Sequence, residues 1–398
     1  MKASSRFNKL GTGIFARNDL RKKLYNKNQY GSRKPTLIDF SLGSSDLLPP
    51  AAVIKAIQKN LENPLSFSYS LHSSTNAFRE SVSAWAKSRF DVNVDPEREI
   101  LLLVGSQEGT AHLPLAVVNP GDHGLILDPS YPSHLGGLLL ADANVERLRL
   151  FESDSWKPVW NSLKTSQYEQ LSIAVLGYPH NPTAQVGDQA LLEELMFIAG
   201  KYNFVVANDN PYVDLAIEGK APSLLFCQGW REFGIEFFSF SKAWNMGGLR
   251  VAFAIGAEPI ITALRGVKNI VDFNQSFAIQ AGAIAAFEEA PDFPKKVLNT
   301  YKIRRDKTTL ELKKLGWNIP ISTMAMYLWI PLPAWAINLG WNDEDFAKEL
   351  LSNTGVALMP GSGFGHGGQD WIRMALVKPL YELEEAINRI SVWCNEFN

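Results

Sequence analysis

Short runs of consecutive apolar residues alternate with longer segments of mixed apolar and polar character from about residue 99 to residue 289. We interpret the apolar runs as strands covered on both faces, and mixed segments such as Thr110–Val118 as the helices that cover them. The predicted strands are Glu99–Gly105, Gly124–Asp128, Ile173–Gly177, Phe204–Asp209, Glu236–Ser241 and Val251–Ile255. This alternation predicts an α/β fold.

A domain boundary is predicted near residue 290. The long apolar stretch Asp272–Glu289 ends in two glutamates, and Pro291 and Pro294 follow it. The remainder of the chain mixes helical segments with short strands such as Ala325–Ile330, which is typical of a smaller α+β domain. We therefore predict an N-terminal segment of residues 1–46 that contributes to the small domain, a large domain of residues 47–289 and a small domain of residues 290–398.

Composition and charge narrow the class of protein. The chain has 398 residues, of which 46% are hydrophobic and 20% charged, with a formal net charge of -2 and a pI near 6.3. This balance gives no reason to expect a nucleic-acid partner. The six histidines show no metal-ligand spacing, so we predict no metal site.

The sequence also argues against export and against a membrane location. Residues 1–15 lack an apolar core of signal-peptide length, and no window approaches the run of about 20 apolar residues that crosses a bilayer. Cys227 and Cys394 are too few for a disulfide framework and fit a reducing compartment. We therefore predict a cytoplasmic protein.

Candidate ligand-binding residues follow the predicted strands, at the edge where open α/β sheets bind ligands. Ser106 and Gln107 follow a glycine between a strand and a helix, where free backbone N–H groups and the helix dipole favour a phosphate. The alternative is a glycine turn that only starts the helix. Tyr131 lies in the turn after the next strand and offers a flat surface for an aromatic ring, although a turn tyrosine commonly only packs.

Two further strand ends carry polar side chains. Asn181 lies between prolines in Tyr178–Thr183, where it is held rigidly and can donate a hydrogen bond, although Asn-Pro is also an ordinary turn. Asp209 ends the next strand, and Tyr212 follows it. A buried carboxylate needs a cationic partner, which a protonated pyridine nitrogen would supply. A helix cap or a structural salt bridge is the alternative for Asp209.

Lys242 is the most informative residue of the chain. It follows Ser239 and Ser241 at the predicted end of a buried strand, where desolvation favours the neutral, nucleophilic amine. The two hydroxyls, with Arg250 eight positions after the lysine, are suited to a phosphate dianion. Lysine, hydroxyls and arginine together predict a pyridoxal phosphate site in which the lysine forms a Schiff base. Alone, a lysine at a strand end more often extends to solvent.

Taken in order, these motifs resemble the fold-type I pyridoxal-phosphate-dependent enzymes, specifically the class I/II aminotransferases. The resemblance covers about residues 38–375 and includes GSQEG, DPSYP, YPHNPT, NDNPY, SFSK and the late PGSGFG and WIRMA. It implies the aspartate aminotransferase-like fold, with a mostly parallel seven-stranded sheet in the large cofactor-binding domain. It also implies a transferase of amino-acid biosynthesis that exchanges an amino group between an amino acid and a 2-oxo acid by a ping-pong mechanism.

The resemblance implies a role for each matching residue. Lys242 would form the Schiff base and shuttle the proton, Asp209 would pair with the pyridine nitrogen, and Tyr131 would stack on the ring. Asn181 and Tyr212 would hydrogen-bond the phenolic oxygen, and Arg373 would clamp the substrate carboxylate. The phosphate would be surrounded by Ser106, Gln107, Ser239, Ser241 and Arg250. Tyr69 and Asn274 match positions that complete the site, with Tyr69 coming from the partner subunit, so a homodimer is implied.

Within the superfamily, SFSKAWNMGGLRVAFAIG and the late PGSGFG look most like the LL-diaminopimelate aminotransferase group. Three positions depart from it on the substrate side or near the cofactor. A glycine, Gly13, lies where the group has its N-terminal tyrosine; Ser45 replaces the second glycine of LGxGD; and Ala184 replaces the last glycine of NPTG. The changes at Gly13 and Ser45 leave the amino-acid substrate open. We expect glutamate and 2-oxoglutarate as one substrate pair.

Two other functions are compatible with parts of this pattern. A lyase or synthase of the same fold would use the same cofactor residues, because the pocket selects which bond breaks. A non-catalytic pyridoxal-phosphate-binding transcription regulator would need an N-terminal helix-turn-helix domain, and the segment before Ile38 is too short for one. We therefore predict an aminotransferase.

Overall fold

A computed structural model describes residues 3–27 and 35–397 of the chain. Its centre is a seven-stranded sheet in the order β2-β8-β7-β6-β5-β3-β4, in which β8 runs antiparallel to both neighbours and the other strands run in one direction. The strands are β2 (Ile100–Leu103), β3 (His123–Asp128), β4 (Asn144–Arg149), β5 (Leu171–Leu176), β6 (Val205–Asp209), β7 (Gly234–Ser239) and β8 (Ala252–Gly256). The predicted α/β fold with a mostly parallel sheet is confirmed.

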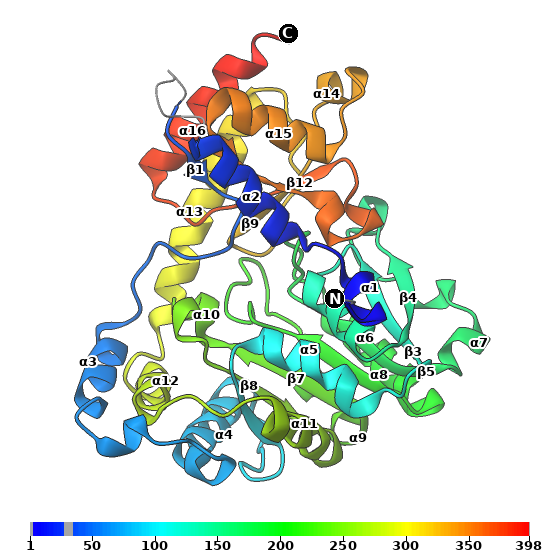
Figure 1. Cartoon of the computed structure of the whole chain (residues 1–398), viewed down its shortest axis with the longest axis vertical. Coiled ribbons are helices and arrows are strands. Elements are labelled where there is room, and N and C mark those ends of the chain that lie inside the picture. Colours follow the sequence, from blue (N-terminus) through cyan, green and yellow to red (C-terminus); the bar gives the residue numbers. More distant parts are fainter. Residues whose placement is uncertain (1–2, 28–34, 398) are drawn as a thin grey trace.

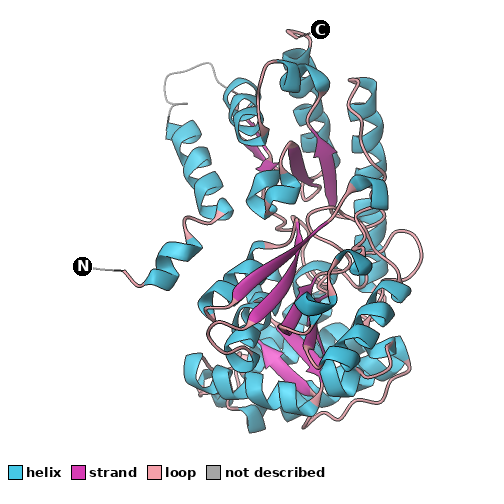
Figure 2. Ribbon diagram, turned by 90° about the vertical axis from the view of Figure 1, so that its right-hand side faces the viewer, coloured by secondary structure: helices cyan, strands magenta, loops and turns pink. Residues whose placement is uncertain are grey.

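Helices cover both faces of this sheet (Figures 1 and 2). One face packs against α5 (Ser106–Val117), α6 (Pro132–Leu140) and α11 (Glu258–Val271). The other face packs against α4 (Asn76–Phe90), α8 (Gln189–Tyr202) and α12 (Phe277–Glu289). Strands buried on both faces account for the continuous apolar runs in the sequence.

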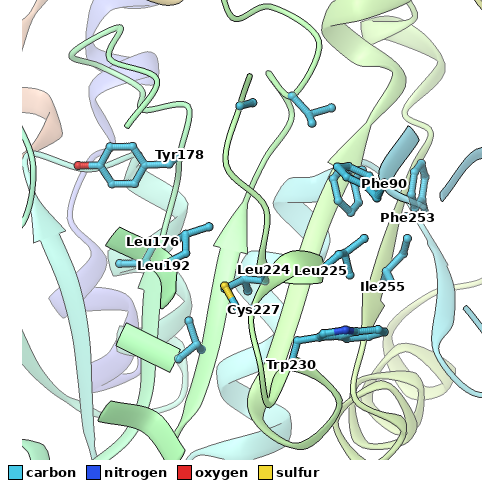
Figure 3. Packing of buried hydrophobic residues seen from close by; sticks show 14 of the residues in the cluster. Phe90, Leu176, Tyr178, Leu192, Leu224, Leu225, Cys227, Trp230, Phe253 and Ile255 are labelled. Carbon is cyan, nitrogen blue, oxygen red and sulfur yellow. The ribbon is translucent and has the colours of Figure 1, made fainter. Parts of the chain in front are cut away.

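The core on the second face is rich in aromatic residues. Figure 3 shows part of it, with Phe90, Phe253 and Trp230 at one end and Leu176, Leu192 and Tyr178 at the other. All of these side chains are buried. This packing fixes the sheet, and with it the strand ends that carry the candidate chemistry.

Most of residues 293–397 form a smaller layer above the sheet (Figure 1). A three-stranded antiparallel sheet, in the order β11-β12-β9, packs against long helices around a second core. Its strands are β9 (Tyr327–Pro331), β11 (Met359–Pro360) and β12 (Trp371–Ala375), and its helices are α13 (Phe293–Lys314), α14 (Ala334–Asn338), α15 (Asp343–Thr354) and α16 (Leu380–Cys394). The short β1 (Ile38–Asp39) pairs in parallel with β10 (Val356–Ala357). The N-terminal segment therefore contacts this layer, and the domain boundaries themselves stay a prediction.

The remaining helices connect or flank these layers. They are α1 (Ser5–Leu10), α2 (Ile14–Lys27), α3 (Ala51–Asn60), α7 (Thr165–Tyr168), α9 (Trp230–Phe233) and α10 (Phe240–Ala243). Short 3-10 turns lie at 64–67, 72–75, 152–154, 160–162, 224–226, 247–249, 361–364 and 366–368. In the described part of the chain, no helix is long and apolar enough to cross a membrane.

Candidate active site

A cavity of about 280 Å³ opens between the strand ends of the large sheet and the smaller layer. Its lining includes the ends of β6 and β7, the start of α5 and residues from the N-terminal segment, β9 and β12. Twelve predicted site residues line it: Ser45, Ser106, Gln107, Tyr131, Asn181, Asp209, Tyr212, Ser239, Ser241, Lys242, Arg250 and Arg373. Residues that are far apart in the sequence are thus brought to one place.

One end of the cavity is suited to an anion. Gly105 precedes α5 with φ of 82°, and the Arg250 guanidinium lies so close that a Cβ on Gly105 would be 2.3 Å from Nη2. Ser239 Oγ donates to Ser241 Oγ at 2.9 Å at the end of β7. The free N–H groups of α5, these hydroxyls and the guanidinium therefore face the same space.

Lys242 lines the cavity from the short helix α10, which directly follows β7. Ser239 caps this helix by accepting a hydrogen bond from the Ser241 N–H, so the strand ends at Ser239. Our prediction that the strand reaches Ser241 was therefore wrong by two residues. The Lys242 amine donates to the Gly43 carbonyl at 2.6 Å and lies 5.9 Å from the centre of the Tyr212 ring.

Asp209, at the end of β6, presents a buried carboxylate to the cavity. One oxygen, Oδ2, lies 3.4 Å from Nε2 of His134. The other oxygen, Oδ1, is buried and has no hydrogen-bond partner among the described residues. A buried carboxylate oxygen without a partner is unfavourable unless a bound group donates to it. Asp209 is therefore prepared for a ligand that carries a proton or a positive charge.

Asn181, Tyr212, Tyr327 and Arg373 form a buried cluster beside Lys242. Arg373 donates to Asn181 Oδ1 at 2.7 Å, and its guanidinium lies 4.5 Å from the centre of the Tyr327 ring and 4.7 Å from that of Phe364. The Asn181 amide donates to the Tyr212 hydroxyl at 3.4 Å. The position of the Asn181 side chain is thus set by Arg373 and Tyr212. The Nε atom of Arg373 has no partner within the described part of the chain.

The Tyr212 and Tyr327 hydroxyls are 3.1 Å apart and influence each other. Burial, together with Tyr327, raises the pKa of Tyr212 well above its usual value. Burial also opposes ionisation of Tyr327, but the charges of Lys242 and Arg373 and the hydrogen bond from Tyr212 outweigh it and lower the pKa of Tyr327. Tyr212 therefore stays protonated and can donate a hydrogen bond to an oxygen in the cavity.

The cavity residues that were missed in the sequence include Tyr327, His134 and Phe15. Tyr327 begins β9, and a Cβ on Gly43 would be 2.0 Å from its hydroxyl, so the glycine leaves room for the phenol. His134 reaches Asp209 from α6. Phe15 reaches the cavity from α2, and the centre of its ring lies 6.0 Å from that of Tyr131. The position of His134 three residues after Tyr131 was the one local signal. Nothing in the sequence near Tyr327 or Phe15 distinguishes them from ordinary core residues.

The remaining predicted residues lie in different settings. Ser45 lines the cavity, but its hydroxyl oxygen accepts hydrogen bonds from the Leu47 N–H at 3.1 Å and from the Tyr301 hydroxyl at 2.9 Å. That Ser45 contacts the substrate, as its place on the substrate side of the motif implies, stays a prediction. Tyr69 and Asn274 do not line the cavity. Tyr69 is 82% exposed, and the Asn274 amide donates to the Ser70 carbonyl at 3.0 Å.

The family model for aminotransferase class I and II matches residues 35–390. The chain therefore belongs to this family, and its fold is that of the aspartate aminotransferase-like pyridoxal phosphate enzymes. It is accordingly an aminotransferase that depends on pyridoxal phosphate. The predictions of family, fold, cofactor and reaction class are confirmed.

Three relatives give a finer comparison. The chain is 34% identical to the glutamate-pyruvate aminotransferase AlaC of Escherichia coli, with 90% of this chain and 87% of AlaC covered. It is 35% identical to an LL-diaminopimelate aminotransferase of Aquifex aeolicus, with 89% and 91% covered. A solved structure of a probable N-succinyldiaminopimelate aminotransferase from Thermus thermophilus is 36% identical and has a TM-score of 0.88, with 95% and 99% covered. The expected likeness to the diaminopimelate group is confirmed.

The cavity fits pyridoxal phosphate at three separate points. The Asp209 oxygen without a partner suits a protonated pyridine nitrogen, and the guanidinium above Gly105 suits the phosphate. The Lys242 amine lines the same cavity and is suited to hold the aldehyde carbon. When bound, the cofactor supplies an electron sink for charge at the substrate alpha carbon. No cluster of three or more metal-ligating side chains is found in residues 3–27 and 35–397.

Proposed function

We propose that Lys242, Asp209 and Arg373 divide the work of transamination. Asp209 would keep the ring nitrogen protonated, Lys242 would bind the cofactor and move a proton at the alpha carbon, and Arg373 would hold the substrate carboxylate. The observation that carries this proposal is the buried Arg373, held between two rings and hydrogen-bonded to Asn181 through Nη1 at 2.7 Å. Because Asn181 is also proposed to bind the cofactor oxygen, substrate and cofactor would be aligned by one shared side chain.

The remaining cofactor contacts follow from the same lining. Ser106, Gln107, Ser239, Ser241 and Arg250 would hold the phosphate, and Asn181, Tyr212 and Tyr131 would contact the ring and its oxygen. Tyr131 donates to Gln107 Oε1 at 3.2 Å, which orients the phenol beside the phosphate end. Burial raises the pKa of Tyr131 to about 12, so this hydroxyl remains a donor across the working pH range.

We propose glutamate and 2-oxoglutarate as one substrate pair. The name of the Escherichia coli relative, a glutamate-pyruvate aminotransferase, supports it. Diaminopimelate is a second candidate partner, supported by the names of several relatives. Of the cationic side chains that line the cavity, Lys242 and Arg250 are assigned to the cofactor and Arg373 to the alpha carboxylate. A distal carboxylate would thus be bound by neutral groups or by a partner subunit.

A half-reaction screen tests the substrate. The purified protein carrying pyridoxal phosphate would be mixed in turn with glutamate, alanine, aspartate, an aromatic amino acid and LL-diaminopimelate. Loss of the visible cofactor band shows conversion to the pyridoxamine form, which a lyase need not accumulate. Conversion by glutamate supports the proposed pair, fast conversion by diaminopimelate alone would assign the narrow substrate, and conversion by none would contradict the proposal.

We also propose that the protein acts as a homodimer with shared active sites. Two neighbouring segments, residues 67–71 and 270–274, are joined by a bridge between Ser70 and Asn274 and by rings 4.8 Å apart. They expose a set of large apolar side chains: Phe67, Tyr69, Leu71, Ile270, Val271 and Phe273. Such a patch on a folded domain is typical of a subunit interface. Tyr69 would then reach the partner's cavity.

Sedimentation tests the dimer. Replacing Ile270, which is 87% exposed, with Asp would place a charge on the apolar patch without disturbing the core. We expect a monomer with little activity, whereas a fully active monomer of the unaltered protein would contradict the shared site. Cytoplasmic location also stays a proposal, which the two buried free thiols of Cys227 and Cys394 support.

A further inference from the structure

Glu236 is a buried carboxylate behind the active site. It lies on β7 with 0% of its surface exposed, and its side chain accepts four hydrogen bonds. Oε1 accepts from the amides of Asn208 and Asn210, each at 2.8 Å. Oε2 accepts from the Ser223 hydroxyl and from the Leu224 N–H at 3.0 Å. All four donors are neutral, so this acid is surrounded as an anion would be but without a cation.

Burying this carboxylate lowers the stability of the folded protein. Burial raises the pKa of Glu236 to about 7, against the lowering effect of its four hydrogen bonds. The carboxylate is therefore ionised above neutral pH at the expense of stability. Buried acids of this kind are concentrated at functional sites. The four donors therefore indicate which segments Glu236 holds in place.

Two of the donors flank Asp209. The Asn208 amide is oriented by the Tyr178 backbone, because its Oδ1 accepts from the Tyr178 N–H at 2.9 Å and its Nδ2 donates to the Tyr178 carbonyl at 3.2 Å. The Asn210 amide also donates to the Pro222 carbonyl at 3.1 Å. Both NH2 groups are thus directed at the same oxygen of Glu236. The residues before and after Asp209 share one acceptor.

The Asp209 carboxylate has little support of its own. Its one hydrogen-bond contact in the described part of the chain is His134 at 3.4 Å. Its direction therefore depends on the backbone at residues 208–210. The same network reaches Tyr178, three residues before Asn181, so it links two segments that the proposed function places on the cofactor.

We propose that Glu236 is a positioning residue for the cofactor site: its carboxylate holds Asn208 and Asn210 so that Asp209 and the Tyr178–Asn181 segment keep the geometry that pyridoxal phosphate requires. This inference rests on the proposed role of Asp209. Glu236 itself does not line the cavity. It acts through its neighbours, as residues behind a binding site commonly do.

The test is the substitution Glu236→Gln, which keeps the shape but replaces one acceptor oxygen with a donor. Each oxygen accepts two hydrogen bonds, so the two donors at the replaced oxygen lose their acceptor. We expect pyridoxal phosphate to bind at least about tenfold more weakly, since a hydrogen bond to a charged group is involved. In the protein without cofactor, we expect faster amide hydrogen exchange in peptides covering residues 176–184 and 205–212.

Glu99→Gln is the matched control. Glu99 is also a buried glutamate at the sheet, but it accepts from the Asp95 N–H and from Arg231, both at 2.8 Å, away from the cavity. The Glu99→Gln substitution should lower stability. It should leave cofactor affinity unchanged, and also amide hydrogen exchange in residues 176–184 and 205–212. If Glu236→Gln does not fold, Asn210→Ala removes one of the two amide contacts and should also weaken cofactor binding.

Three results are distinguishable. Weaker cofactor binding and faster exchange in Glu236→Gln, but not in Glu99→Gln, support the inference. Affinity within twofold of the unaltered protein, with unchanged exchange, would overturn it and show that Glu236 serves only packing. If the unaltered protein itself binds no pyridoxal phosphate, the assigned cofactor site fails instead, independently of Glu236.

Discussion

Replacing Gly105 with Ala should weaken binding at the proposed phosphate site without unfolding the protein. Gly105 has φ of 82° and ψ of 152°, a region that residues with a side chain rarely adopt. The strain should cost about 1 to 3 kcal/mol of stability. In addition, the new Cβ would lie 2.3 Å from Nη2 of Arg250. The guanidinium is the end of a flexible side chain, so we expect it to move away and not to unfold the protein.

The displaced guanidinium should lose the hydrogen bond that we propose between Arg250 and the phosphate. A hydrogen bond that involves a charged group contributes about 1.5 to 3 kcal/mol. The dissociation constant of pyridoxal phosphate should therefore rise roughly 10- to 100-fold. Absorbance titration of the cofactor-free protein measures this change, and urea denaturation of the same sample measures the backbone strain.

Gly121→Ala provides the matched control. Gly121 has φ of 90°, and a Cβ there would meet no atom within 4 Å. It should therefore carry similar strain without displacing a cofactor residue. Equal cofactor affinity in the two variants would refute the reasoning, because it would mean that Arg250 does not contact the phosphate.

Three further predictions address other parts of the site. Lys242→Ala should abolish turnover and remove the visible band of the bound cofactor; an active variant with an unchanged spectrum would defeat the assignment. Arg373→Lys should raise KM for the amino acid about tenfold or more, because a point charge cannot reproduce the planar fork; unchanged KM in steady-state kinetics would place the carboxylate elsewhere. The raised pKa of Glu236, about 7, means that the cofactor-free protein should lose about 3 kcal/mol relative to Glu236→Gln as pH rises from about 4.5 to above 7. Urea denaturation of both proteins at pH 5 and pH 8 checks this, and a difference that does not vary with pH would contradict it.

The cofactor side of the site could be predicted because its chemistry is local in sequence. Asp209 ends a strand, Lys242 lies three residues beyond the next strand, and Ser106 begins a helix three residues after a strand ends. Each combines an apolar run with a polar residue at its end, and the sheet brings these ends together. The order of motifs then made the family recognisable.

Other features had no such local signal. β4 contains Glu146, Arg147 and Arg149 on the edge of the sheet, where much of the strand is exposed, so it lacks the apolar run that marks the buried strands. Tyr327 begins a strand that was predicted, but its role depends on the space left by Gly43, nearly 300 positions earlier in the chain. Contacts of this kind are decided by tertiary packing.

The two sides of the site also differ in how freely they can change. The residues proposed to hold the cofactor include several at strand ends of a single sheet, and buried cores on both faces fix that sheet. The rest of the lining is assembled from separate segments, with Phe15 on α2, Gly43 in a loop and Tyr327 on β9. Exchanging one of these residues alters the pocket without altering the sheet. A change of amino-acid substrate can therefore be accommodated in these segments while the sheet stays the same. Gly13 directly precedes α2 and Ser45 lies two residues after Gly43, so both departures lie there.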